Sequence, residues 1–166
     1  QSNYIHGDIP LSYSNLENLE FISLSNNYLV GLLPTLTSQN LTLINFSNNN
    51  LSGDIPINYY DLKALEYLYL NNNNLNGSVY PIIRVKNTVD LSHNNLNGML
   101  PSLILSYVIN LNISNNHLRG SLSSVSSYNY LIDMRNNTSA THEINASGLV
   151  PTDSYIISNN LLCPYL

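Results

Sequence analysis

The fold of this chain is decided by the stretch Leu62–Pro81, which reads LKALEYLYLNNNNLNGSVYP. Leucines precede and follow Asn73 at fixed offsets, and Gly77 and Pro81 close the stretch. The same frame recurs along the chain around one asparagine per unit, called a frame asparagine below. The frame asparagines are Asn3, Asn27, Asn49, Asn73, Asn94, Asn116, Asn137 and Asn160, at spacings of 24, 22, 24, 21, 22, 21 and 23 residues. A period in the low twenties predicts a solenoid of stacked repeats.

Each repeat is predicted to contribute one short strand just before its frame asparagine. Apolar pairs such as Leu68 and Leu70 alternate with polar residues, which is typical of a half-buried strand. One strand per repeat with a crossover to the next gives a parallel sheet. The strands are expected near residues 22–24, 44–46, 68–70, 89–91, 111–113 and 132–134. We therefore predict an α/β-type solenoid of mostly parallel β-structure, a right-handed superhelix with one concave parallel sheet.

The frame asparagines are interpreted as a structural ladder and not as ligands. An asparagine side chain has two donors and one acceptor. At the turn that leaves the strand, these groups would bond to the backbone of their own and adjacent repeats, since an unpaired buried polar group is costly.

The repeats resemble those of plant-type leucine-rich-repeat extracellular proteins. The resemblance is carried by segments such as Leu24–Asn27 (LSNN), Asn50–Pro56 (NLSGDIP), Asp90–Leu96 (DLSHNNL) and Asn95–Pro101 (NLNGMLP). Members of that group include ectodomains of receptor-like proteins and receptor kinases, and secreted inhibitors of polygalacturonase-type enzymes. Similar repeats occur in extracellular proteins of protists. The resemblance implies an extracellular, N-glycosylated chain that binds a protein, peptide or glycan ligand on the concave sheet or its flank.

By length, residues 1–166 are one leucine-rich-repeat domain of about eight repeats, the first truncated. The stretch 138–145 separates Asn137 from its Gly-x-Val-Pro tail and is expected to bulge as a loop. Residues 154–166 resemble a final repeat running into a C-terminal cap. The single cysteine, Cys163, has its disulfide partner outside this chain or in a second chain, or is a free thiol.

A patch of aromatic and charged side chains is the candidate ligand-binding surface. Strand residues that point away from the core form columns about 5 Å apart on neighbouring strands. Exposed aromatics with a few charges resemble binding hot spots, although tyrosines on a solvated face can also serve only to cover their strand neighbours. The candidate residues, called the patch below, are Tyr67, Tyr69, Asp90, Asn112, Asp133 and Arg135.

The sequence argues against catalysis, a metal site or nucleic-acid binding. Asp90 and Asp133 lie two repeats apart, about 10 Å, at the wide limit for a carboxylate pair in glycoside hydrolysis, and no histidine stands beside them in the column. Calcium held by Asp90, Asn112 and Asp133 is a minor alternative. With 5 basic and 10 acidic residues and a net charge of −5, the chain lacks the basic stripe of a nucleic-acid reader. No cofactor is expected, and no membrane span lies within this sequence.

Eight asparagines precede an x-Ser or x-Thr, and those off the core are the expected N-glycan acceptors. They are Asn40, Asn50, Asn76 and Asn145. Two functions follow for an extracellular or cell-surface protein. The first is a recognition module within a larger receptor-like or adhesion protein. The second is a structural glycoprotein whose end repeats self-assemble into a surface layer or filament, because an open sheet edge can pair with another chain.

Overall fold

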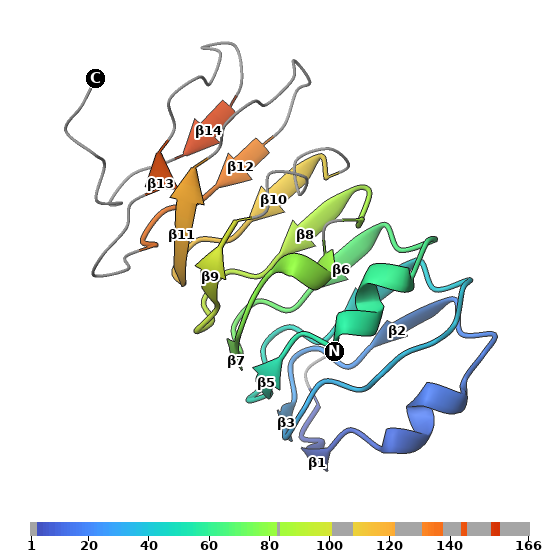
Figure 1. Ribbon diagram of the computed structural model, residues 1–166. Helices are drawn as coiled ribbons and strands as arrows, with labels where there is room; N and C mark the ends of the chain where they lie inside the picture. Colours follow the sequence, from blue (N-terminus) through green and yellow to red (C-terminus); the bar gives the residue numbers. More distant parts are fainter. Residues whose placement is uncertain are drawn as a thin grey trace.

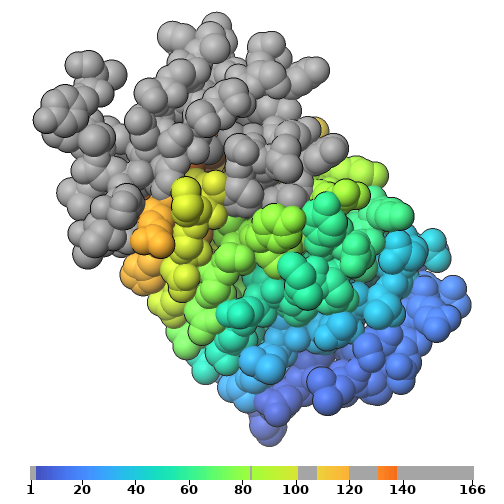
Figure 2. Space-filling model, viewed as in Figure 1, coloured from blue at the N-terminus to red at the C-terminus, as the bar shows by residue number. Residues whose placement is uncertain are grey.

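The computed structural model describes residues 3–82, 84–100, 108–121, 131–137, 144–145 and 154–156. Two rows of short strands run along the molecule, and three 3₁₀ helices lie on the flank near its N-terminal half (Figure 1). In the space-filling view the repeats form bands that lie side by side in chain order (Figure 2). The chain is thus a solenoid, as the period predicts.

The first row of strands forms one parallel sheet of seven strands, called the main sheet below. Its strand order follows the chain order, so each strand pairs only with its neighbours in the sequence of repeats. This sheet is the predicted concave sheet. Its strands are β2 (Phe21–Ser23), β4 (Leu43–Asn45), β6 (Tyr67–Tyr69), β8 (Thr88–Asp90), β10 (Asn110–Asn112), β12 (Leu131–Asp133) and β14 (Ser154–Ile156).

The second row of strands comes from the segments that follow the frame asparagines. It forms three small parallel sheets, ordered β1-β3, β5-β7 and β9-β11-β13. Their bounds are β1 His6–Asp8, β3 Tyr28–Val30, β5 Ser52–Asp54, β7 Asn74–Asn76, β9 Asn97–Met99, β11 His117–Ser121 and β13 Ile144–Asn145. The helices η1 (Leu11–Asn15) and η2 (Ile57–Asp61) follow Pro10 and Pro56, and η3 spans Tyr80–Ile82.

Strand β13 corrects the expectation of a loop over residues 138–145. Ile144 and Asn145 pair with Gly120 and Ser121 of β11, so the end of that segment continues the second row of strands. Residues 138–143 lie outside the described part of the chain. Of the expected C-terminal cap, residues 154–156 form strand β14, and residues 157–166, with Asn160 and Cys163, also lie outside it.

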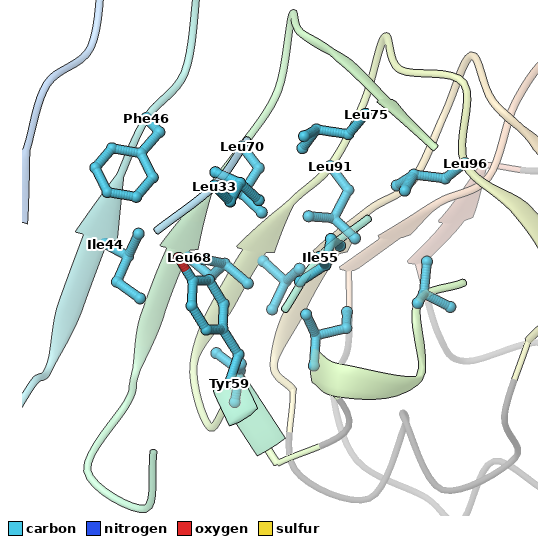
Figure 3. Packing of buried hydrophobic residues seen from close by; sticks show 14 of the residues in the cluster. Leu33, Ile44, Phe46, Ile55, Tyr59, Leu68, Leu70, Leu75, Leu91 and Leu96 are labelled. Carbon is cyan, nitrogen blue, oxygen red and sulfur yellow. The ribbon is translucent and has the colours of Figure 1, made fainter. Parts of the chain in front are cut away.

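The core fills the space between the two rows of strands. In the repeats of β4, β6, β8 and β10 the central strand residue is buried, as are the apolar residue after the strand and the leucine two residues after the frame asparagine; Leu68, Leu70 and Leu75 are each 0% exposed. Figure 3 shows side chains of successive repeats, such as Phe46, Leu70 and Leu91, packed in the same layer. Tyr59 of η2 is also buried, donates its hydroxyl to the Pro34 carbonyl at 3.1 Å, and has its pKa raised by that burial.

The frame asparagines connect consecutive repeats through their side-chain amides. The Nδ2 group of Asn94 donates to the carbonyls of Leu91 and Ser92 in its own turn and to Leu70 of the previous repeat, at 3.0–3.3 Å. Its Oδ1 accepts from the backbone N–H of Leu75 at 3.0 Å. The same pattern, with Oδ1 reaching back to the previous repeat, holds at Asn49, Asn73 and Asn116. Each such amide therefore satisfies backbone groups that have no ladder partner.

These bonds explain why each main-sheet strand ends one residue before its predicted end. The Leu70 N–H still bonds to the next strand, at the Asp90 carbonyl. The Leu70 carbonyl, however, receives the amides of Asn73 and Asn94 in place of a strand partner. The chain accordingly leaves the sheet at Leu70, and the strand spans residues 67–69.

Gly77 shows why a glycine follows each turn. Its φ is +74°, a conformation that L residues rarely adopt, and a Cβ there would collide with the Asp54 carboxylate of the previous repeat. The residue that precedes a frame asparagine also has a positive φ, for example Asn72 at 56° and His93 at 55°. Asparagine tolerates this region better than most residues.

Candidate functional site

The register of the main sheet brings five of the six patch residues onto adjacent strands. Tyr69 of β6 pairs with Asp90 of β8, Asp90 with Asn112 of β10, and Asn112 with Asp133 of β12. These four residues therefore form one row, with about 4.8 Å between neighbouring strands. Tyr67 lies in the parallel row beside Thr88, and Arg135 follows β12 by two residues.

Four of the patch residues line one shallow hollow of about 200 Å³ on the exposed face of the main sheet. Tyr67 and Arg135 lie outside its lining. Thr88, Asn110 and Leu131, which the sequence analysis did not include in the patch, complete the exposed side of the hollow. Its full lining is Tyr69, Thr88, Val89, Asp90, Asn110, Leu111, Asn112, Leu131 and Asp133.

Asp133 and Arg135 form a bidentate ion pair. The Arg135 Nη2 lies 2.6 Å from Asp133 Oδ2, and its Nε lies 2.9 and 3.1 Å from the two carboxylate oxygens. The hydrogen bond to Asp133 and the attraction of its charge raise the pKa of Arg135. Both oxygens of the Asp133 carboxylate are therefore engaged by its own neighbour.

Asp90 and Asn112 each use one side-chain oxygen to hold the turn that follows their strand. Asp90 Oδ1 accepts from the backbone N–H and the hydroxyl of Ser92 at 3.0 and 2.7 Å. Asn112 Oδ1 makes the same two bonds to Ser114 at 3.2 and 2.8 Å. Asn45 repeats the pattern with Ser47. These are side-chain turns of the Asx type, and their sequence signal is Asn or Asp followed two residues later by Ser.

The two tyrosines of the patch differ in their hydrogen bonds. Tyr67 accepts a hydrogen bond from the Asn87 amide at 2.9 Å. The Tyr69 hydroxyl has no hydrogen-bond partner among the described residues. Both rings are half-buried, so each presents one side to solvent.

A second exposed feature, which the sequence analysis missed, lies one residue before each frame asparagine. We call it the outer row: Asn26, Asn48, Asn72, His93, Asn115 and Asn136. Neighbouring amides within it are hydrogen-bonded, Asn48 to Asn26 at 3.1 Å, Asn72 to Asn48 at 2.8 Å and Asn136 to Asn115 at 2.8 Å. The runs of consecutive asparagines at these turns were its only sequence signal.

The predicted glycan acceptors Asn40, Asn50 and Asn76 are exposed. Asn145 is placed in β13 and not in a loop. Asn112, which also precedes Ile-Ser, is half-buried in the patch. Within the described ranges, no group of three His, Cys, Asp or Glu side chains gathers as metal ligands would. No helix in the same ranges has the length and apolar character needed to cross a membrane.

Comparison with known proteins gives the family. The pattern described as Leucine Rich Repeat matches residues 18–39, 40–62, 64–85 and 87–106. No curated protein sequence matches the chain.

Among solved structures, the plant peptide hormone receptor RGFR1 in complex with RGF2 shares 33% identity over 72% of this chain, with a TM-score of 0.66. The ectodomain of GASSHO1/SCHENGEN3, an Arabidopsis thaliana membrane receptor kinase in complex with CASPARIAN STRIP INTEGRITY FACTOR 2, shares 27% over 86%, with a TM-score of 0.73. A plant ice-binding protein shares 26% over 92%, with a TM-score of 0.76.

The matched region is a part of each of these proteins. It spans 20% and 18% of the two receptor chains and 52% of the ice-binding protein. The repeat pattern, the parallel main sheet and these similarities lead to one conclusion: the chain belongs to the leucine-rich-repeat family.

Proposed function

We propose that this chain is an extracellular recognition module that binds a protein or peptide across the exposed face of the main sheet. The observation that carries the proposal is the row Tyr69, Asp90, Asn112 and Asp133, which the sheet register holds side by side around one hollow. An aromatic ring, a carboxylate and an amide in fixed order provide contact area and orientation for one partner.

The comparisons support this kind of partner. Two of the similar structures are receptors in complexes: the plant peptide hormone receptor RGFR1 with RGF2, and the receptor kinase GASSHO1/SCHENGEN3 with CASPARIAN STRIP INTEGRITY FACTOR 2. An extended peptide laid along the main sheet would meet a different side chain at each strand, since adjacent strands lie about 4.8 Å apart. This surface could therefore distinguish peptides by their amino-acid sequence.

An extracellular setting is part of the same proposal. Asn40, Asn50 and Asn76 are exposed and stand outside the main sheet, so glycans attached to them would leave the patch open. We expect the protein from its native source to carry N-linked glycans at these positions. Intact-mass measurement before and after enzymatic deglycosylation tests this, and a mass equal to that of the bare polypeptide removes it.

The binding proposal is tested with labelled synthetic nonapeptide pools, each with one residue type fixed at one position. The peptide that binds most tightly is then measured against Tyr69→Ala and Tyr80→Ala. Tyr80 is an exposed tyrosine outside the main sheet, on η3, and serves as the matched control. We expect Tyr69→Ala to weaken binding by at least about 1 kcal/mol, roughly fivefold, and Tyr80→Ala to leave it unchanged.

Two results would overturn the proposal. The first is equal binding by both variants, which would place the contact elsewhere. The second is no peptide binding together with concentration-dependent self-association, measured by light scattering, that changes near Asn3–Pro10 abolish. That second result would favour the structural glycoprotein.

The outer row favours a second candidate function, adhesion to ice. Five of its six residues are asparagines, and three neighbouring pairs of their amides are hydrogen-bonded, an array that ordered water could match. One similar structure is an ice-binding protein. The test is inhibition of ice recrystallisation, with Asn48→Gly as the variant, because glycine keeps the positive φ of 56° and removes the amide. No inhibition by the unchanged protein would eliminate this candidate.

A further inference from the structure

The hollow on the main sheet contains one carboxylate oxygen that nothing in the described part of the protein engages. Asp90 Oδ1 is taken by the N–H and hydroxyl of Ser92. Asp90 Oδ2 has no hydrogen-bond or ionic partner among the described residues. Since Asp90 lies between Tyr69 and Asn112 in the row, this oxygen is at the middle of the patch.

The other carboxylate in the hollow is not equivalent. Both oxygens of Asp133 are engaged by the Arg135 guanidinium at 2.6–3.1 Å. A ligand cation that binds Asp133 would have to displace the Arg135 guanidinium. Asp90 is therefore the group in the hollow that can accept a positive charge from outside.

The surroundings of Asp90 suit a basic side chain. The Tyr69 ring stands on the adjacent strand, and a cation over a tyrosine face gains about 0.5–1 kcal/mol at an exposed site. The protein already contains one such contact, with Arg84 4.4 Å from the centre of the Tyr60 ring. Leu131, at the other side of the hollow, offers apolar surface to an aliphatic stem.

We propose that the ligand of this surface is a peptide that places a lysine or arginine side chain in the hollow, and that Asp90 is the residue that selects it. This inference rests on the proposed peptide-binding function. The net charge of −5 also favours a cationic partner during approach.

The hydrogen bonds of Asp90 limit the geometry of that contact. Ser92 occupies the two acceptor sites of Oδ1, and each carboxylate oxygen has about two. A bidentate guanidinium contact needs both carboxylate oxygens. Because only Oδ2 is available, arginine would form a monodentate contact. We therefore expect lysine to be accepted about as well as arginine.

The chain itself provides the variants that separate charge from structure. Asn112 and Asn45 make the same bonds to a following serine as Asp90 does. Asp90→Asn therefore removes the charge and keeps the turn. Asn112→Asp is the reciprocal change, because it adds a carboxylate one strand away, with the turn again preserved.

The experiment measures nonapeptide pools with lysine fixed at one position against pools with norleucine fixed there, a side chain of similar length without the charge. For the unchanged protein we expect the best lysine pool to bind about five- to tenfold more tightly than its norleucine counterpart. Asp90→Asn should reduce this preference to about twofold or less. Asn112→Asp should increase it. Thermal melting of each variant checks that the fold is retained.

Failure of this inference is distinguishable from failure of the proposed function. A lysine preference that survives in Asp90→Asn and does not grow in Asn112→Asp overturns the role of Asp90. Peptide binding that Tyr69→Ala weakens, but without any preference for lysine, overturns the basic ligand and leaves recognition intact. No binding by any pool overturns both.

Discussion

The turn after each main-sheet strand and the exposed face of the strand itself are only a few residues apart, yet they behave in opposite ways. The turn is repeated with little change: a frame asparagine with the same bonds, preceded by a residue with a positive φ. The face changes at every strand, through Ser23, Asn45, Tyr69, Asp90, Asn112 and Asp133. Uniform positions build the solenoid, and variable positions are available to distinguish ligands.

The boundary between the two regions is not sharp. Asp90 and Asn112 belong to the variable face, but each lends one oxygen to the turn. Asn and Asp make the same two bonds to the following serine at these positions, so the turn accepts either residue and the charge can differ between them.

The largest effect is expected from removing a frame asparagine. Asn94→Ala leaves the carbonyl of Leu70 and the N–H of Leu75 without the Asn94 amide, and should lower the free energy of unfolding by about 1–3 kcal/mol. Asn95→Ala is the matched control, since Asn95 is exposed and, among the described residues, its amide bonds only to Asn74. It should stay within about 0.5 kcal/mol. Equal shifts of the urea midpoint for both variants would show that the turn is not held by the frame asparagine.

A smaller effect is expected at the outer row. Asn72 has a φ of 56°, so Asn72→Ala forces an alanine into the left-handed region and should cost about 1 kcal/mol. Asn72→Gly removes the same side chain without that strain and should cost less than alanine. Thermal unfolding of the pair gives the difference. Since both variants lose the same amide bond, a larger loss for glycine than for alanine would show that the positive φ at Asn72 does not strain alanine, contrary to this prediction.

The smallest effect on stability is expected for Asp90→Asn, measured beside Asp90→Ala. Asp90→Ala loses the two bonds to Ser92 and should cost about 0.5–1.5 kcal/mol. Asp90→Asn should cost less, because asparagine makes the same bonds at Asn112. Guanidinium titration of the two variants tests this order. An equal loss in both would mean that the turn requires the charge, contrary to the pattern at Asn45 and Asn112.

The sequence was sufficient to predict the repeat, the parallel sheet and the rows of the patch, because the period of the frame asparagines sets the register and strand alternation sets the face. It placed the end of each strand one residue too late, since it did not show that the frame amides would bond to the carbonyl of a residue such as Leu70. It also did not reveal strand β13, because Ile144–Asn145 follows an irregular stretch that has no frame asparagine.

The sequence also could not show which patch atoms lack a hydrogen-bond partner in the protein and are free to bind a ligand. The pairing of Arg135 with Asp133 and of Ser92 with Asp90 depends on the path of the chain where it leaves the strand. Periodicity identifies which side chains share a face, but it carries no information on their hydrogen bonds.

The central claim, that the main sheet is the working surface, is tested most directly by cross-linking. The tightest-binding nonapeptide is prepared with a photoreactive residue, irradiated in complex with the protein, and the cross-linked residues are identified by mass spectrometry. We expect attachment within β6, β8, β10 and β12, at residues 67–69, 88–90, 110–112 and 131–133. Attachment at Asn3–Pro10 or at the helices η1 to η3, with none on the main sheet, would contradict it.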